Sequence, residues 1–438
     1  MQTNFSLAQL ADPATAESER ILRTCVHCGF CTATCPTYVL LGDELDSPRG
    51  RIYLIKDMLE HDRPATSDVV THIDRCLSCL SCMTTCPSGV HYMHLVDHAR
   101  VHIERTYRRP LLDRLRRDLL AKVLPNPSLL RIASTLGLLA WFLAPVFALV
   151  GATRIAAMLR LANAVPVALA DKAGRTFFPE GERRGRVAIL SGCANQVLKP
   201  SINAAAIRLL NRHGIEVVLP EGEVCCGAIV HHLGREEETL AFVRRNIDVW
   251  TGEIEGRGLD AILVTASGCG TMIKDYGFLL RNDSAYATNA ARVAELTKDI
   301  SEYLMNLGLN QPAQDIGLVV AYQSPCSLQH GQKVVSEPKT LLMKAGFAVR
   351  DVPEGHLCCG SAGTYNMLQP EIAAHLRDRK LANIATLKPD IIATGNVGCM
   401  AQLRTATTLP VVHTVELLDW ATGGPRPAEI KGVPAGTA

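Results

Sequence analysis

Residues 25–36 are Cys25-Val-His-Cys28-Gly-Phe-Cys31-Thr-Ala-Thr-Cys35-Pro36, and residues 76–87 are Cys76-Leu-Ser-Cys79-Leu-Ser-Cys82-Met-Thr-Thr-Cys86-Pro87. Both segments have the spacing C-x2-C-x2-C-x3-C-P, which holds [4Fe–4S] clusters in bacterial two-cluster proteins. The first three thiolates of such a run bind one cluster, and the fourth, next to the proline, binds the other cluster. The sequence therefore predicts one cluster on Cys25, Cys28, Cys31 and Cys86, and a second on Cys76, Cys79, Cys82 and Cys35.

Zinc is the main alternative for these eight cysteines. Structural zinc sites usually have four ligands in separated C-x2-C pairs, whereas each run here has four cysteines and ends in proline. The opening residues, 1–22, are mostly polar and lack the basic start and apolar core of a secretory signal. We therefore expect a reducing, cytoplasmic location, where clustered cysteines are metal ligands rather than disulfides.

A helix is predicted between the two runs. Ser47 followed by Pro48 is a typical helix start, and apolar residues follow at helical spacing, so this helix should pack under the clusters. Arg49 and Arg51 lie in its first turn. Their side chains either offset cluster charge, meet a partner, or lie in solvent.

The region after residue 100 combines a basic amphipathic pattern, residues 100–131, with an uncharged stretch, residues 132–153. The stretch has the minimum length of a membrane span, although Pro145 and its small or polar residues weaken that interpretation. A basic helix beside a short apolar hairpin suits docking on an anionic bilayer surface and access to a quinone. Burial against a partner protein or the chain's own core is the alternative.

The other eight cysteines form two sets in the same order. The sets are Cys193, Cys225, Cys226 and Cys269, and Cys326, Cys358, Cys359 and Cys399. The first three members of the second set lie 133 residues after their counterparts. Each set contains Cys-Cys-Gly and has Gly-Cys at its end, so the sequence predicts a duplicated domain.

Each of these cysteines follows a predicted strand. The expected strands are residues 186–190, 215–219 and 261–265 in the first half, and 316–321, 348–352 and 391–394 in the second. Strands that alternate with helices form parallel sheets, which bind ligands at the carboxyl ends of their strands. We therefore expect each set to converge at a sheet edge, around a further iron–sulfur cluster, a zinc ion or a reversible disulfide. Gly227 and Gly360 should allow the tight turns that this requires.

These patterns predict an α/β multidomain chain. The expected parts are a helical ferredoxin-like module with two [4Fe–4S] clusters (1–108), a docking segment (109–184), a first Cys-Cys-Gly domain (185–312), a second one (313–425) and a flexible tail (426–438). The net charge of +2 gives no general attraction to nucleic acid. No G-x-G-x-x-G follows a predicted strand. Because clusters pass single electrons, a flavin on a partner must carry out any two-electron oxidation.

A two-cluster module followed by two Cys-Cys-Gly domains resembles the family of glycolate oxidase iron–sulfur subunits. That family is related to an iron–sulfur component of anaerobic glycerol-3-phosphate dehydrogenase, to lactate-utilisation proteins and to heterodisulfide reductase subunits. The resemblance is carried by residues 25–36, 41–56, 265–270 and 356–365. It spans nearly the whole chain and is weakest over residues 110–185.

The resemblance implies a non-flavin subunit of a membrane-associated dehydrogenase, peripheral on the inner face of the cell membrane. It would relay electrons from FAD-binding glycolate oxidase subunits, which convert glycolate to glyoxylate, toward a quinone-type acceptor. A related lactate or glycerol-3-phosphate dehydrogenase complex is one alternative. A thiol–disulfide enzyme is another, but those relatives end each Cys-Cys-Gly domain in C-x-x-C, where this chain has Met272 and Gln402.

Overall fold

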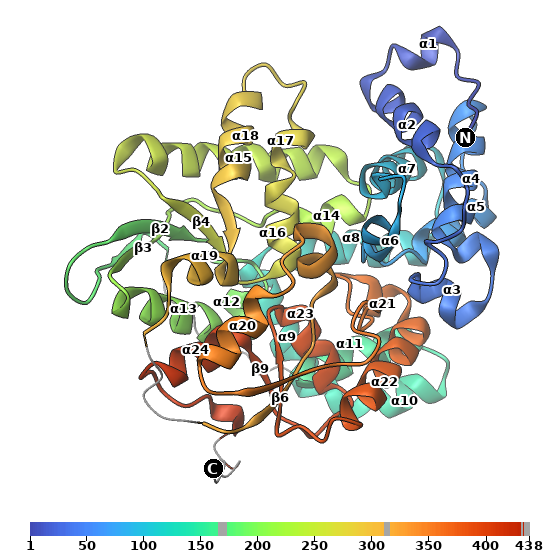
Figure 1. The fold of residues 1–438 in the computed structure, drawn as a ribbon. Coiled ribbons are helices and arrows are strands. Elements are labelled where there is room, and N and C mark those ends of the chain that lie inside the picture. Colours follow the sequence, from blue (N-terminus) through green and yellow to red (C-terminus); the bar gives the residue numbers. More distant parts are fainter. Residues whose placement is uncertain (165–172, 311–315, 431, 433–438) are drawn as a thin grey trace.

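The structure, a computed structural model, describes all residues except 165–172, 311–315, 431 and 433–438. A helical N-terminal module lies at one side of two α/β halves, which stack on each other (Figure 1). The described residues thus form the α/β multidomain chain that the sequence predicts.

The N-terminal module is built from short helices around a small apolar core. Its helices are α1 (Leu7–Leu10), α2 (Pro13–Thr24), α3 (Pro36–Leu41), η1 (Glu44–Asp46), α4 (Pro48–Glu60), α5 (Ser67–Asp74), α6 (Ser81–Thr85) and α7 (Tyr92–Thr106). Helix α4 begins where the sequence predicts, because the Ser47 side chain accepts a hydrogen bond from the backbone N–H of Gly50. Its apolar face, including Ile52 and Ile55, is buried in the core beside Cys25 and Cys76.

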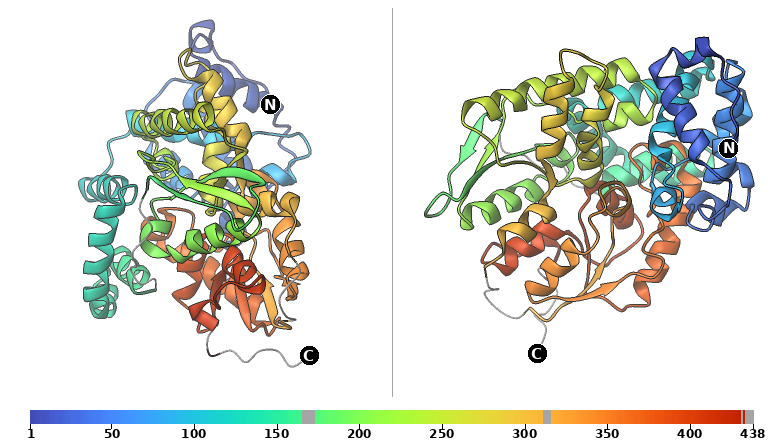
Figure 2. Two further views of the ribbon diagram at one scale, coloured as in Figure 1. Left: turned by 90° about the vertical axis from the view of Figure 1, so that its left-hand side faces the viewer. Right: turned by 45° about the horizontal axis from the view of Figure 1, so that its top comes forward.

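Four helices follow the module and stand at one edge of the molecule (Figure 2, left). They are α8 (Leu111–Val123), α9 (Pro127–Ala140), α10 (Ala144–Leu149) and α11 (Thr153–Ala164), with a 3-10 turn, η2 (Trp141–Leu143), before α10. Among the described residues, the segment Pro127–Leu149 is long and apolar enough to cross a membrane by length and composition, and 11% of its most apolar window is buried. The segment therefore leaves most of its apolar surface uncovered.

The first half contains a five-stranded sheet in the order β1-β3-β2-β4-β5. The strands are β1 (Arg175–Phe177), β2 (Gly185–Ile189), β3 (Ile215–Leu219), β4 (Ala261–Val264) and β5 (Thr297–Asp299). The helices are α12 (Asn195–Leu198), α13 (Ser201–Arg212), α14 (Ala228–His232), α15 (Glu236–Gly256), α16 (Ser267–Lys274), α17 (Tyr276–Leu279), α18 (Ala287–Leu296) and α19 (Ile300–Leu307). All neighbouring strands are parallel except β1, which pairs antiparallel with β3. The sheet thus begins inside the range expected as the docking segment.

The second half repeats this arrangement without the antiparallel strand. Its sheet has the order β7-β6-β8-β9 and is parallel throughout. Its elements are β6 (Val319–Tyr322), η3 (Ser327–Gln332), α20 (Glu337–Lys344), β7 (Ala348–Asp351), α21 (Tyr365–Leu368), α22 (Pro370–Ala385), β8 (Ile391–Thr394), α23 (Val397–Arg404), β9 (Val411–His413) and α24 (Thr414–Ala421). The matching strand order supports the predicted duplication, and the two halves share one apolar core in which α13 contacts α24.

Part of the expected flexible tail is ordered. Residues Ala428–Ile430 form a 3-10 turn, η4, in which Ile430 is fully buried in the shared core. The Glu429 carboxylate pairs with Lys199 of the first half. An apolar side chain and an ion pair thus fix this turn against the two halves, whereas most of the residues that follow lie outside the described part of the chain.

Candidate iron–sulfur sites

The two N-terminal cysteine runs form loops of the same backbone shape. Left-handed φ angles occur two and four residues after the first cysteine of each run: at His27 (56°) and Gly29 (84°), and at Ser78 (50°) and Leu80 (63°). Left-handed residues in a tight loop turn backbone N–H groups toward its inside and form an anion-binding concavity. Three of these four residues are not glycine, so the loops hold a costly conformation, as functional sites often do.

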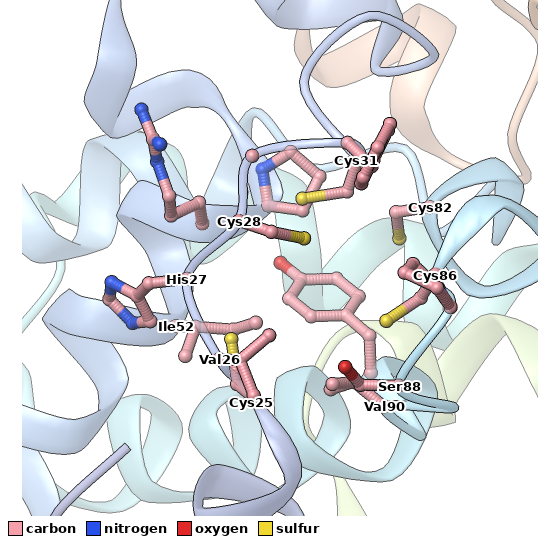
Figure 3. A pocket seen from close by; sticks show the side chains of 16 residues that line it. Cys25, Val26, His27, Cys28, Cys31, Ile52, Cys82, Cys86, Ser88 and Val90 are labelled. Atoms are coloured by element: carbon pink, nitrogen blue, oxygen red, sulfur yellow. The ribbon is translucent and has the colours of Figure 1, made fainter.

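Three cysteines of the first loop and one of the second surround a single pocket. Cys25, Cys28 and Cys31 line it together with Cys86, and Figure 3 shows the four sulfur atoms around the same space. Cys82 also reaches this pocket. The structure thus brings together the four cysteines predicted for one cluster.

A second pocket contains the other predicted set. Cys35, Cys76, Cys79 and Cys82 line it. The fourth cysteine of each run therefore lies at the site of the other run, as the spacing predicts. Because Cys82 lines both pockets, the two sites are directly adjacent.

The chemistry of these donor sets fits iron–sulfur clusters. Burial and the neighbouring Cys25 raise the pKa of Cys31 to about 11. Burial, followed by the charges of nearby cysteines, also raises the pKa values of Cys79 and Cys82. Four adjacent thiolates are therefore stable only around a cationic metal centre, and two sets of four cysteines with inward N–H groups match the ligands of [4Fe–4S] clusters.

A buried arginine lies beside the second pocket. The Arg51 side chain is 1% exposed, and its guanidinium lies 3.7 Å from Cys35 Sγ and 3.2 Å from Asp46 Oδ1. Asp46 is also buried and pairs with Arg75 and His72. Although burial opposes the charge of Arg51, the nearby cysteines, Tyr92 and Asp46 raise its pKa. Arg51 therefore places a permanent positive charge next to a predicted cluster ligand, which the sequence left undecided.

The first C-terminal set converges at the carboxyl edge of its sheet, as predicted. Cys193 follows β2, Cys225 and Cys226 follow β3, and Cys269 lies on α16 after β4. The sulfur atoms of Cys193 and Cys225 are 3.5 Å apart, and the Cys226 side chain contacts those of both Cys225 and Cys269. All four thiols thus meet at one point.

The second set has the same geometry. The Cys358 side chain contacts those of Cys326 and Cys359, and Cys359 contacts Cys399. The predicted tight turns are confirmed, because Gly227 and Gly360 both have a φ of 87°. A Cβ at Gly360 would lie 2.4 Å from the backbone oxygen of Ala373, so only glycine fits there.

The charges around the two sets differ. In the first half, Glu223 is half-buried, and its removal from water raises its pKa to about 7 although it accepts hydrogen bonds from the Ser191 N–H and from Trp250. In the second half, the Lys380 side chain is 2% exposed and donates to the backbone oxygen of Glu354. Hydrogen bonds from Cys358 and Cys399 lower the pKa of Cys359, and the charge of Lys380 adds to this lowering. The second set therefore has a more positive surrounding.

The N-terminal module meets the second half through apolar and neutral contacts. Leu77 and Cys79 pack in one apolar cluster with Cys326, Cys358 and Tyr365. This joint is completed by two hydrogen bonds, Thr84 Oγ1 to His330 Nδ1 (2.7 Å) and Tyr365 O–H to the Arg75 backbone oxygen (3.0 Å). The second ferredoxin-like site and the second C-terminal set are therefore neighbours.

The joint between the module and the first half is charged. The carboxylate of Asp97 on α7 lies 3.1 Å from His231 Nε2 and 3.4 Å from Arg100 Nη1. On the same helix, His94 Nε2 lies 2.9 Å from Asp275 Oδ1. His231 and His330, which stand near the cysteines in the sequence, are thus occupied by contacts between domains rather than aimed at the thiols.

Three relatives extend over different shares of the chain. The glycolate oxidase iron–sulfur subunit of Escherichia coli (strain K12) is 43% identical over 96% of this chain and 99% of its own length. The probable glycolate oxidase iron–sulfur subunit of Bacillus subtilis (strain 168) is 31% identical over 92% of this chain and 94% of its own length. The lactate utilization protein A of Bacillus licheniformis is 25% identical over 53% of this chain and 99% of its own length.

Two domain families match the parts that the structure separates. The family described as a 4Fe-4S dicluster domain matches residues 21–90, and the family described as a cysteine-rich domain matches residues 187–274 and 320–404. Fold and cysteine placement thus define an iron–sulfur protein with a two-cluster module and a duplicated cysteine-rich domain. With the two long alignments above, the chain belongs to the family of glycolate oxidase iron–sulfur subunits.

Proposed function

We propose that this chain is the electron-transfer subunit of a glycolate-oxidising dehydrogenase, and that it passes single electrons from a partner flavin toward a quinone-type acceptor. The observation that supports this most strongly is the series of adjacent cysteine sites. The two ferredoxin-like pockets share Cys82, and Cys79 of the second pocket packs with Cys326 of the second half. Such a series suits stepwise electron transfer across the chain.

Iron–sulfur clusters supply reversible one-electron transfer at such sites. The protein contributes the thiols, the positive charge and the exclusion of water. Leu77 and Leu80 are buried beside the second pocket, and a dry surrounding strengthens electrostatic effects. Arg51 favours the more negative, reduced state of a centre held by Cys35, because its charge lies close to that sulfur.

The eight N-terminal cysteines are proposed as the ligands of two [4Fe–4S] clusters in the two sets given above. For the C-terminal sets we favour a further iron–sulfur centre in the second half, because this set adjoins the second pocket and has Lys380 nearby. Zinc is the rival to an iron–sulfur centre in the first half, where the half-buried Glu223 lies two residues before Cys225.

The substrate and the partner come from the relatives. Two proteins that align over almost the whole chain are named as glycolate oxidase iron–sulfur subunits. We therefore propose FAD-binding partner subunits that oxidise glycolate to glyoxylate. The lactate utilization protein aligns over about half of the chain, which supports the lactate alternative less well.

A ligand substitution in the first loop tests the relay. In Cys28→Ser, we expect glycolate oxidation linked to a quinone to be lost and the iron content to fall, while the partner subunits keep their flavin. Ala33→Ser is the matched control, because it places a serine in the same loop at an exposed position away from the pocket. A Cys28→Ser complex with wild-type turnover would refute the relay.

We infer a location on the inner face of the cell membrane, through the surface formed by α8, α9 and α10. Large apolar side chains are exposed on all three segments, and the set includes Leu112 and Leu115 of α8, Leu136 and Leu139 of α9, and Leu149 of α10. Exposed Arg114 and Lys122 lie on α8 beside them. Apolar side chains flanked by cations bind an anionic bilayer surface.

Sedimentation with phosphatidylglycerol-containing vesicles tests this location. The double variant Leu136→Glu and Leu139→Glu should lose at least about tenfold in vesicle affinity, since it places two charges in the apolar surface. Leu7→Glu is the control, because Leu7 is also exposed but lies on α1 in the N-terminal module. Equal vesicle binding by all three proteins would instead assign this surface to a protein partner.

A further inference from the structure

A cavity of about 190 Å³ lies between α11 and helices α21, α22 and α23 of the second half. Ala157 and Arg160 line it from α11, and Asn366, Ala374 and Gln402 line it from the second half. A cavity of roughly 150 Å³ already admits a benzene ring. The space is therefore large enough for one substituted six-membered ring.

The cavity lies next to the exposed apolar helices. Ala148 of α10 forms part of its lining, and α11, which supplies one wall, contacts both α9 and α10. The apolar side chains around it, such as Leu149 and Val150, are exposed. A ligand with a long apolar tail can thus place its ring in the cavity while the tail stays at the apolar surface.

The opposite wall of the cavity is formed by helices of the second half that lie next to the second cysteine set. Gln402 lies three residues after Cys399 on α23, which is about one helical turn. The Gln402 side chain donates to the backbone oxygen of Ala373, at the same place where Gly360 of the Cys-Cys-Gly turn makes its closest approach. A ring in the cavity is thus separated from these cysteines by one layer of residues.

The cavity also offers polar groups on two sides. The Asn366 side chain is 7% exposed and donates to Gln402 Oε1, while its own Oδ1 is buried and has no hydrogen-bond partner among the described residues. Arg160 supplies donors from α11. A quinone ring needs donors for its carbonyl oxygens, and the reduced ring needs acceptors for its hydroxyl groups. Arg160 supplies the donors, and the exposed carboxylate of Glu371, which also lines the cavity, supplies the acceptors.

We propose that this cavity binds the ring of a membrane quinone, the electron acceptor of the proposed function on which this inference rests. The substrate of the partner subunit first reduces the partner's flavin. Two electrons then pass singly from this flavin through the chain to one quinone, which also takes up two protons from water. The product is the quinol, and the flavin returns to its oxidised form.

Two substitutions that fill the cavity from opposite walls test the proposal in the whole complex. Ala157→Trp and Ala374→Trp should lower turnover with a decyl-tailed benzoquinone at least about tenfold relative to turnover with a soluble dye in the same preparation. Ala382→Trp is the matched control, because Ala382 lies on the same helix as Ala374, is exposed and does not line the cavity. Its quinone-to-dye ratio should equal that of the wild type.

Photolabelling gives a readout that does not depend on turnover or on the variants folding. A short-tailed azidobenzoquinone should label peptides of α11 and α22 in the wild-type complex, and excess decyl-tailed benzoquinone should prevent it. Labelling elsewhere, or an unchanged quinone-to-dye ratio in both tryptophan variants, overturns the quinone site and leaves the proposed function standing. A wild-type complex that oxidises no glycolate with either acceptor overturns the proposed function itself.

Discussion

The two C-terminal halves have the same strand order and the same four-cysteine geometry, but different neighbours. The second set packs against the N-terminal module through Leu77 and Cys79 and has a buried lysine nearby. The first set is enclosed by its own half, in a core with Trp250 and Tyr276. Duplication thus determined where the thiols meet, whereas contacts with the rest of the chain determine which site can exchange electrons.

The two halves also differ in how they contact the N-terminal module. The joint with the first half depends on the buried carboxylate of Asp97 and its cations, whereas the joint with the second half is apolar and neutral. Apolar packing brings the second pocket and the second set close together through contacts that include no ion pair across the joint among the described residues. The charged joint is therefore suited to holding the module in place, and the neutral one to electron transfer.

Substitution of one cysteine in each C-terminal set should change turnover most and should separate the two halves. Cys326→Ser should lower quinone-linked turnover by about a hundredfold or more, because it alters the set beside the second pocket, whereas Cys193→Ser should cost less than about tenfold. Turnover, iron and sulfide content, and EPR spectra of the two purified complexes measure this. Equal losses in both variants would place both sets on the electron path.

The charged joint should respond strongly to the loss of its anion. Asp97→Asn leaves two histidines and an arginine without a carboxylate, so the free energy of unfolding should fall by about 3–5 kcal/mol, as for other buried pairs that lose one partner. Chemical unfolding with a probe in the N-terminal module measures the change. A loss below about 1 kcal/mol would mean that the Asp97 pairs resemble surface ion pairs.

The equivalent helix caps of the two halves should respond to pH in opposite directions. Asp299 after β5 caps α19, and burial raises its pKa to about 6. His413 after β9 caps α24, and burial lowers its pKa to about 4. The folded state therefore binds extra protons at Asp299 between about pH 4 and 6 and lacks protons at His413 between about pH 4 and 6.5.

The sign follows from these proton differences. As pH rises through this window, the contribution of Asp299 to stability falls and that of His413 grows, each by about 3 kcal/mol for a shift of about two pKa units. Relative to wild type, Asp299→Asn should make the slope of stability against pH more positive, and His413→Gln should make this slope more negative. Melting temperatures between pH 4.5 and 7 measure both slopes. If both variants changed the slope in the same direction relative to wild type, the opposite roles of the caps would be contradicted.

The smallest expected effect concerns the neutral joint. Tyr365→Phe removes the hydrogen bond to the Arg75 backbone oxygen and keeps the apolar packing, so stability should fall by about 1 kcal/mol. Quinone-linked turnover should stay within about twofold of wild type, because the ring still fills the joint. A large loss of turnover would show that the hydroxyl group itself takes part in electron transfer.

Much of the fold follows from local patterns. The apolar runs predict strands β2, β3, β4, β6, β7 and β8 to within a few residues, and the cysteine spacing predicts all four sets. Strands β1, β5 and β9 were missed because each has three residues, too few for a recognisable apolar run. Arg49 and Arg51 lie in the same helical turn, yet Arg49 pairs with Glu44 near the surface and Arg51 is buried on Asp46. Only the packing of the loop before the helix decides between these outcomes.

The contact between the second pocket and the second half also has no local signal. Leu77 and Cys326 are far apart in sequence, and their neighbourhood depends on how the folded surfaces of two domains fit. The same holds for the cavity beside α11, because its lining comes from helices that precede the first half in sequence and from helices that follow it.

The placement of Cys35 and Cys86 at the pocket of the other run has a consequence for how iron enters the protein. Loss of either cluster would free a cysteine in the loop that surrounds the remaining cluster. A module with one cluster is therefore less stable than both the empty module and the module with two clusters. We therefore expect iron incorporation to be cooperative. Cells short of iron would then contain a mixture of empty and fully loaded chains, rather than a uniform population of chains with one cluster each.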